Sequence, residues 1–269
     1  MKLISVQDIS CYGQCSLTVA LPILSYFGIE TVILPSAILS THTGGFTDFV
    51  VQDLTSLMPK IVSHWISEEI KADAIYTGYI GSSEQFDIIL DMKDKMLKED
   101  GLFFVDPAMA DHGKMYYGLG IDIVKGMRRM CSLADYILPN ITEACFLTDT
   151  PYTEDLSDDY IDLLLSKLYM LGCKNVILTG VEINDSIGAY YYNGEKREGI
   201  LFPKEEKSYH GTGDIFTSVV IGELCSGRSI NDSIKAAASF VIDSIKKTKN
   251  DSSHNYGVKF EEVLREKRY

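Results

Sequence analysis

The stretch Gly211-Thr212-Gly213-Asp214-Ile215-Phe216-Thr217-Ser218-Val219-Val220-Ile221 places two glycines and a carboxylate directly before an apolar helix. Two glycines let the backbone approach an anion closely, and the first turn of a helix directs unpaired N–H groups and a positive dipole end at that anion. The arrangement suits a phosphate group. Asp214 also fits a simple helix cap, so the functional interpretation needs support from elsewhere in the chain.

The rest of the chain alternates short apolar runs with longer helical patterns, which sets the fold class. The patterns predict strands at 3–6, 31–34, 74–77, 102–105, 136–138 and 176–178, and helices near 54–70, 161–171, 214–226 and 231–247. This alternation predicts an α/β fold: a mainly parallel central sheet flanked by helices on both faces, in a single domain over residues 1–269. In such sheets, ligands bind beyond the carboxyl ends of the strands.

One segment interrupts the alternation. Residues 187–192 and 196–202 read as two strands of an antiparallel hairpin, with Asn193-Gly194 as a type I′ turn between them. We expect this small hairpin to form an edge of the sheet.

Composition limits the classes of partner. The 269 residues carry a net charge of −13 and contain no dense Lys/Arg cluster, which argues against nucleic acid and anionic membranes and favours small molecules. No export signal and no apolar run of about 18 residues is evident, so we expect a cytoplasmic protein with its six cysteines reduced. P-loop, dinucleotide-binding, zincin and serine hydrolase motifs are absent from the sequence.

Acidic and amide side chains follow two further predicted strands. Asp106 and Asp111 come after the strand at 102–105, and Asn140 and Glu143 come after the strand at 136–138. Each pair alone fits a solvated loop or a capping pattern. Together with the glycine-rich helix start, they indicate a site where oxygen ligands hold Mg²⁺ directly or through water. Asp214 would then accept a hydroxyl proton, as phosphoryl transfer to an alcohol requires.

The first, second and third predicted strands are followed by groups that suit a polar aromatic ligand. Asp8 and Ser10 follow the first strand, residues 40–46 follow the second, and Tyr79 follows the third. Their hydroxyls can bind a heteroaromatic ring, while Phe46 or Tyr79 can stack on it. The alternative interpretation, a cap at Ser10 and an ordinary loop at 40–46, is about equally compatible with the sequence.

In their order along the chain, these motifs resemble the ribokinase superfamily and, within it, the pyridoxal kinases, over nearly the whole length. The resemblance implies an ATP-dependent kinase that phosphorylates the 5′-hydroxymethyl group of vitamin B6 compounds. It implies that Gly211, Thr212 and Gly213 form the anion hole and that Asp214 is the catalytic base. It also implies ATP and Mg²⁺ as cofactors and a homodimer, and it leaves a monovalent cation open.

Further site residues are carried over from the same resemblance. The implied ATP contacts are Asp106, Leu138, Asn140, Glu143, Thr179 and Pro203. The implied metal ligands are Asp111 and Glu143, and the substrate contacts are Asp8, Ser10, Thr43, Gly44, Tyr79 and Asp214.

Some positions depart from the pyridoxal kinase pattern. Asp8 stands where those enzymes have a ring-binding serine, and Asp8, Ser10 and His210 are closer to hydroxymethylpyrimidine kinases. Those enzymes typically have cysteine at the position of Asp214, so Asp214 and the loop 42–44 favour vitamin B6. Hydroxymethylpyrimidine kinase remains the nearest alternative, and a catalytically inactive protein that binds B6 or nucleotide is a second. Ala110 in place of the usual glycine is a mild change.

Overall fold

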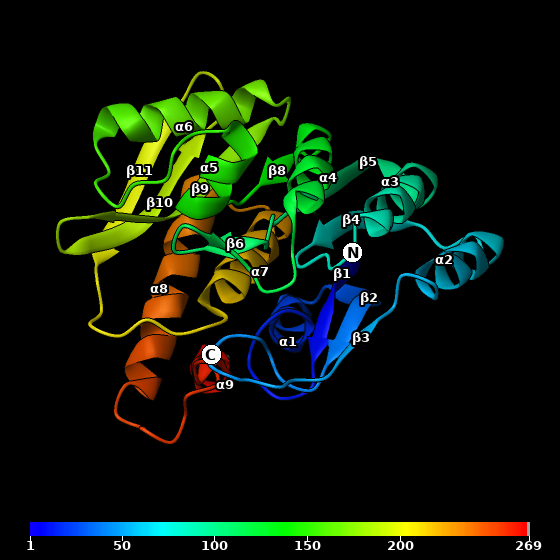
Figure 1. Cartoon of the computed structure of the whole chain (residues 1–269), viewed down its shortest axis with the longest axis horizontal. Coiled ribbons are helices and arrows are strands. Elements are labelled where there is room, and N and C mark those ends of the chain that lie inside the picture. The colour runs from blue at the N-terminus through cyan, green and yellow to red at the C-terminus, as the bar shows by residue number, and fades with distance from the viewer. Residues whose placement is uncertain (268–269) are drawn as a thin grey trace.

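The computed structural model describes residues 1–267, and one large β-sheet runs through it (Figure 1). Six strands pair in parallel: β1 (Lys2–Ser10), β2 (Glu30–Leu39), β4 (Ala72–Thr77), β5 (Leu97–Val105), β8 (Tyr136–Ile137) and β9 (Asn175–Ile183). Antiparallel strands extend both edges: β3 (Val51–Asp53), β10 (Ser186–Tyr192) and β11 (Arg197–Pro203). The strand order is β11-β10-β9-β8-β5-β4-β1-β2-β3.

Helices cover both faces of this sheet, because the strand side chains alternate between two apolar cores. In β5, Phe103 and Val105 enter one core, and Phe104 enters the other. The first core is covered by α2 (Met58–Ser67), α3 (Glu84–Met96), α4 (Ile121–Ser132), α5 (Ile141–Thr148) and α6 (Asp158–Met170). The opposite face carries α1 (Leu17–Tyr26), α7 (Thr212–Cys225), α8 (Ile230–Thr248) and α9 (Phe260–Glu266).

The predicted fold class is confirmed, including the six parallel strands and the antiparallel edge hairpin. The predicted type I′ turn is wrong. Tyr192 pairs with Arg197, so four residues form the loop, and of its Asn193-Gly194 pair only Gly194 has a positive φ. The Asn193 side chain instead accepts hydrogen bonds from the backbone N–H groups of Glu195 and Lys196, which stabilises a longer turn.

The position of β1 determines where a ligand fits. β1 lies between β4 and β2, and the helices that follow β1 and β4 lie on opposite faces of the sheet. The chain therefore leaves β1 and β4 toward opposite faces, and in open α/β sheets ligands bind at the carboxyl edge next to such a point. A small two-stranded sheet, β6 (Ala110–Asp111) and β7 (Lys114–Met115), follows β5 at the same edge.

Two further observations concern residues 1–267. None of the helices there is long and apolar enough to cross a lipid bilayer. All six cysteines are free thiols.

Candidate active site

The first turn of α7 is open at its N-terminus. Gly211 caps the helix with φ +78°, and a Cβ at this position would overlap the carbonyl oxygen of Gln14, so only glycine fits. Among residues 1–267, a Cβ at Gly213 would meet nothing within 4 Å, and no side chain caps the helix. The Thr212 hydroxyl donates to the carbonyl of Tyr209 at 3.1 Å, which holds the preceding loop. The first-turn amides are therefore free to bind an anion.

Asp214 is the third residue of α7 and lies among other acidic groups. Burial raises the pKa of its carboxyl to about 7, and repulsion from the carboxylates of Asp106 and Asp8 contributes. A hydrogen bond from the backbone N–H of Ser16 opposes this shift. A carboxyl group with a pKa near 7 exchanges protons readily at neutral pH, as a general base must.

Asp106 follows β5 directly and is attached to the same helix. The Thr217 hydroxyl, one turn after Asp214, donates to Asp106 Oδ2 at 2.7 Å, and both side chains are buried. Burial raises the pKa of Asp106 to about 6, and the bond from Thr217 partly offsets the rise. Helix α7 thus positions two carboxylates that repel each other.

Asp8 and Ser10 form a buried pair on β1. The Ser10 hydroxyl donates to Asp8 Oδ2 at 2.9 Å. Burial raises the pKa of Asp8, while hydrogen bonds from the hydroxyls of Ser16 and Ser10 lower it. Asp8 also contributes to the raised pKa of Asp214, so the structure brings these two predicted site residues together.

The loop after β2 packs against the residue that precedes the anion-binding turn. A Cβ at Gly44 would overlap the His210 ring, and the buried His42 ring lies 5.3 Å from that of His210 and 5.0 Å from that of Phe46. Thr43 is half-buried between His42 and Gly44. The predicted ring-binding loop therefore contacts the residue that directly precedes the first turn of α7.

Tyr79 follows β4 on the other side of β1. Its pKa is raised to about 12, first by burial and then by the carboxylates of Asp8 and Asp53. Tyr79 is therefore neutral at physiological pH and lies near Asp8, as expected of residues in one pocket.

Asn140 and Glu143 form a capping box at the start of α5. The backbone N–H of Glu143 donates to Asn140 Oδ1 at 2.9 Å, and Glu143 Oε2 accepts from the backbone N–H of Asn140 at 2.9 Å. Glu143 Oε1 accepts from the backbone N–H of Met109 at 3.1 Å, and Asn140 Nδ2 donates to the carbonyl of Ala110 at 2.8 Å. This network ties α5 to the loop that carries Asp106 and Asp111.

The two predicted metal ligands have different environments. The Asp111 side chain is 54% exposed, and its carboxylate accepts from the backbone N–H of His112. Glu143 is 2% exposed, both its oxygens accept backbone hydrogen bonds, and burial raises its pKa well above the usual range. In residues 1–267, no three His, Cys, Asp or Glu side chains gather closely enough to hold a metal ion by themselves.

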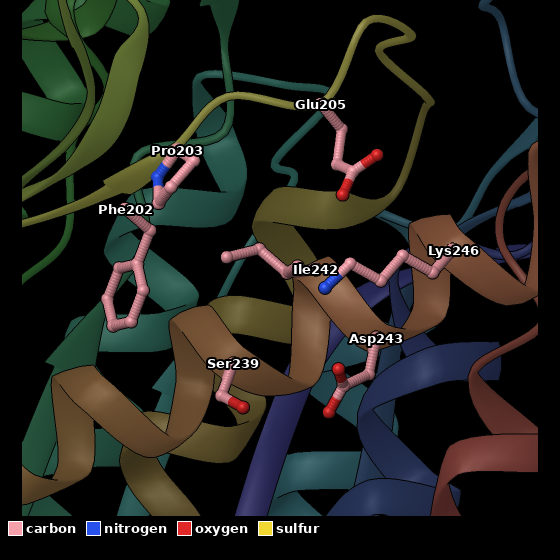
Figure 2. A pocket seen from close by; sticks show the side chains of 7 residues that line it. All are labelled: Phe202, Pro203, Glu205, Ser239, Ile242, Asp243 and Lys246. Carbon is pink, nitrogen blue, oxygen red and sulfur yellow. The ribbon is translucent and has the colours of Figure 1, made fainter.

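The predicted nucleotide contacts fall in two places. Leu138 is buried at the end of β8, and Thr179 on β9 forms a parallel bridge with Asn140. Pro203 lies further along the sheet and lines a cavity of about 210 Å³ between the end of β11 and helix α8 (Figure 2). The cavity is lined by Phe202, Pro203, Glu205, Ser239, Ile242, Asp243 and Lys246.

Sequence reasoning missed several residues of this site. The Tyr116 hydroxyl has a pKa well above its usual range, first because burial disfavours its charged form. Nearby carboxylates raise the pKa further, and they belong to Glu143, Asp111, Asp214 and Asp106. Ser16 and Thr217 bind the two central carboxylates. No motif marks these residues, because only the folded chain brings the start of α1, the residue after β7 and helix α7 close to the acids.

Comparison with known proteins identifies the family. A profile described as phosphomethylpyrimidine kinase matches residues 24–259. The chain belongs to that family. Its relatives place this kinase with the pyridoxal kinases of the ribokinase superfamily, and the fold agrees with theirs.

Three relatives illustrate the similarity of this kinase to known proteins. A phosphomethylpyrimidine kinase homologue from Bacteroides thetaiotaomicron, in a crystal form with pyridoxal, is 36% identical with a TM-score of 0.94, covering 98% of this chain and 94% of that one. Pyridoxal kinase from Lactobacillus plantarum is 29% identical with a TM-score of 0.91, covering 98% and 95%. The Dictyostelium discoideum pyridoxal kinase is 26% identical over 82% of this chain and 77% of its own length.

Proposed function

We propose that this kinase transfers the γ-phosphate of ATP to the 5′-hydroxymethyl group of a vitamin B6 compound: pyridoxal, pyridoxine or pyridoxamine. The observation that carries the proposal is Asp214, whose carboxyl has a pKa of about 7 beside helix N–H groups that no side chain caps. A base of that pKa and an anion site in one helical turn are what phosphoryl transfer to an alcohol needs. The crystal form of the Bacteroides relative with pyridoxal supports the choice of alcohol.

The proposed reaction uses both features of this turn. Asp214 orients the hydroxymethyl group and accepts its proton as the oxygen forms a bond to the γ-phosphorus. The bond from that phosphorus to the bridging oxygen breaks, and ADP leaves. The N–H groups of Gly211, Thr212 and Gly213 bind the transferred phosphoryl oxygens and stabilise their charge.

The vitamin ring binds in the pocket formed by the loops after β1, β2 and β4. Ser10, Thr43 and the backbone of Gly44 supply hydrogen bonds, and Tyr79 covers the ring. Asp8 is held beside Ser10 and recognises a polar substituent of the ring.

ATP lies along the carboxyl edge from α7 toward β11. Asp106, Asn140 and Thr179 line the path of its phosphates and sugar, with Leu138 beneath them. The cavity beside Pro203 receives the base, because it has an apolar wall and a polar rim and lies at the far end of that path.

The residues of the acidic edge fit Mg²⁺ bound largely through ATP and water. Asp111 offers an exposed carboxylate, which suits a hard cation, whereas the Glu143 carboxylate is occupied by two N–H groups and reaches the ion through water. Mg²⁺ supplies neutralisation of the phosphate charge when bound. Because the chain carries a net charge of −13, we expect nucleotide affinity to depend steeply on the divalent ion.

The nearest competing function is phosphorylation of hydroxymethylpyrimidine. The buried Asp8–Ser10 pair and the family profile favour it, because both are associated with the pyrimidine kinases. Both substrates are heteroaromatic alcohols, so the same base and anion site would serve either reaction.

A substrate panel tests the proposal. The purified protein is assayed with Mg-ATP and each of pyridoxal, pyridoxine, pyridoxamine and hydroxymethylpyrimidine, and kcat/KM is compared. We expect the highest value with a B6 compound. A clear preference for the pyrimidine refutes the B6 assignment, and no ADP release with any alcohol refutes catalysis and favours a binding protein.

We also propose a homodimer that forms through the β3 edge. Four apolar side chains there are between 37% and 69% exposed: Ile33, Ile38, Val50 and Val51. An edge strand with exposed apolar side chains is a surface that proteins cover. Light scattering should give twice the chain mass of 30.0 kDa, and a monomer mass contradicts the proposal.

A further inference from the structure

The loop between β1 and α1, residues 11–16, touches the catalytic turn at two points. The carbonyl oxygen of Gln14 packs so tightly on Gly211 that a Cβ there would overlap it. Two residues later, the backbone N–H of Ser16 lies close enough to the Asp214 carboxylate to lower its pKa. The position of this loop therefore sets the position of both the anion-binding turn and the base.

Ser16 shows that the loop does not hold this shape by itself. Its φ is +50°, a conformation that costs a residue with a Cβ on the order of 1–3 kcal/mol and persists only where the surroundings impose it. Ser16 also lacks the side-chain capping bond expected at the start of α1. Other contacts must hold the loop in place.

At its start the loop is held by β2, because the backbone N–H of Cys11 donates to the carbonyl of Leu39 at 2.8 Å. At Gln14 the contacts come from the segment 254–261, more than two hundred residues away in sequence. The backbone N–H of Gln14 donates to the carbonyl of Tyr256 at 2.8 Å. Gln14 Nε2 donates to Glu261 Oε1 at 2.7 Å, and Gln14 Oε1 lies 3.0 Å from His254 Nε2. Because the carboxylate of Glu261 only accepts, the Gln14 amide has one orientation, and His254 donates to it through Nε2–H.

Side-chain packing also joins the segment 254–261 to the loop 11–16. Gly257 has φ +139°, and a Cβ there would crowd the side chain of Gln14. The Tyr256 ring lies 4.7 Å from that of Tyr12 in the same loop. Gln14 therefore fits into a recess that the segment shapes around it.

We propose that the segment 254–261 is a positioning element of the phosphoryl-transfer site and that it acts through Gln14. This inference rests on the proposed kinase function, because it assigns the element to the turn that carries Asp214. Gln14 touches no reacting atom. It holds its own carbonyl against Gly211 and keeps Ser16 near Asp214, so its loss misaligns the base and the phosphate.

The test reverses the polarity of one hydrogen bond. In Gln14→Glu, the new carboxylate faces the carboxylate of Glu261, and their repulsion breaks this contact. The double variant Gln14→Glu with Glu261→Gln restores a donor and an acceptor at the same positions, and it keeps an oxygen for His254. Glu262→Ala is the matched control, because Glu262 lies next to Glu261 in the first turn of α9 and makes no side-chain hydrogen bond within residues 1–267.

Steady-state kinetics with Mg-ATP and the best alcohol supply the first readout. We expect Gln14→Glu to lower kcat about 10-fold, because small misalignments of reacting groups are costly, with both KM values changed by less than about 2-fold. The double variant should recover most of kcat, and Glu262→Ala should match wild type. Equal kcat in wild type and Gln14→Glu, or a loss that the double variant does not restore, overturns the inference.

Hydrogen exchange supplies a readout that needs no activity. Amides of residues 209–216 should exchange about threefold faster in Gln14→Glu, and at the wild-type rate in the double variant and in Glu262→Ala. Unchanged exchange in this segment overturns the inference. A wild-type protein that phosphorylates nothing refutes the proposed function instead, and the exchange result still decides whether segment 254–261 holds the turn.

Discussion

Two carboxylates at the carboxyl edge of the sheet, Asp214 and Glu143, differ in the hydrogen bonds they accept, although burial and the carboxylate of Asp106 raise the pKa of both. Asp214 receives one backbone hydrogen bond and faces the carboxylates of Asp106 and Asp8. Glu143 has each oxygen bound by a backbone N–H and is almost fully buried. Each is the third residue of its helix, α7 or α5. Two acidic residues at the same helical position therefore have different hydrogen-bond partners, which fits the proposed role of Asp214 as a base and a structural role of Glu143.

The difference shows that the supply of hydrogen-bond donors separates the two roles. A carboxylate that is saturated by backbone donors is fixed in place and has little capacity left for a substrate proton. A carboxylate that is short of donors and close to other acids holds a proton near neutral pH and can exchange it. On the proposed function, α7 and β1 build the reactive half of the site, and the α5 capping box builds the rigid half.

The largest effect is expected from removal of the reactive carboxylate. Asp214→Ala should reduce kcat by about 10²–10⁴-fold, the usual contribution of a positioned base, and leave ATP binding by calorimetry nearly unchanged. Asp232→Ala is the matched control, because Asp232 is the third residue of α8 and is bound to the capping Ser229. Near-normal turnover of Asp214→Ala would contradict the proposal that Asp214 is the catalytic base.

Glu143→Gln should lower the free energy of unfolding more clearly than it lowers kcat. Glutamine supplies one acceptor oxygen for two backbone donors and turns an NH₂ group toward one of them, so a buried N–H loses its partner. We expect a loss of about 1–3 kcal/mol in the free energy of unfolding, measured by urea denaturation. If stability is unchanged and only kcat falls, Glu143 belongs to the reactive half and the contrast with Asp214 fails.

The sequence predicted most of the fold and the motifs of the site, because both depend on local patterns. Apolar periodicity located the six parallel strands, and the glycines of the 211–214 stretch located the open helix start. The prediction of the hairpin turn was wrong because the Asn193 side chain accepts hydrogen bonds from the backbone N–H groups of Glu195 and Lys196, which favours a longer loop. The contacts of Ser16, Tyr116 and Thr217 lay beyond prediction, because they join segments distant in sequence.

The pH profile provides a smaller test of the reactive half. Asp214 acts as a base only when deprotonated, so kcat/KM should rise with pH and level off above about 7, where its pKa lies in the folded protein. Below that pH, kcat/KM should fall about 10-fold per unit, as expected for one essential deprotonated group. A profile that stays flat down to pH 5 contradicts the raised pKa. Glu143→Gln should leave the midpoint unchanged.

The smallest effect concerns the coupling between Asp106 and Asp214. Thr217→Val removes the hydroxyl that stabilises the Asp106 carboxylate, so the pKa of Asp106 should rise above its present value of about 6. More Asp106 is then neutral at pH 7, its repulsion of Asp214 weakens, and the pKa of Asp214 falls. The midpoint of the kcat/KM profile should therefore move to lower pH by a fraction of a unit. Ser244→Ala removes a buried helical hydroxyl whose one partner within residues 1–267 is the carbonyl of Phe240, so it should not move the midpoint. A shift to higher pH in Thr217→Val would mean that Asp214 depends on the hydroxyl directly and not through its acidic neighbour.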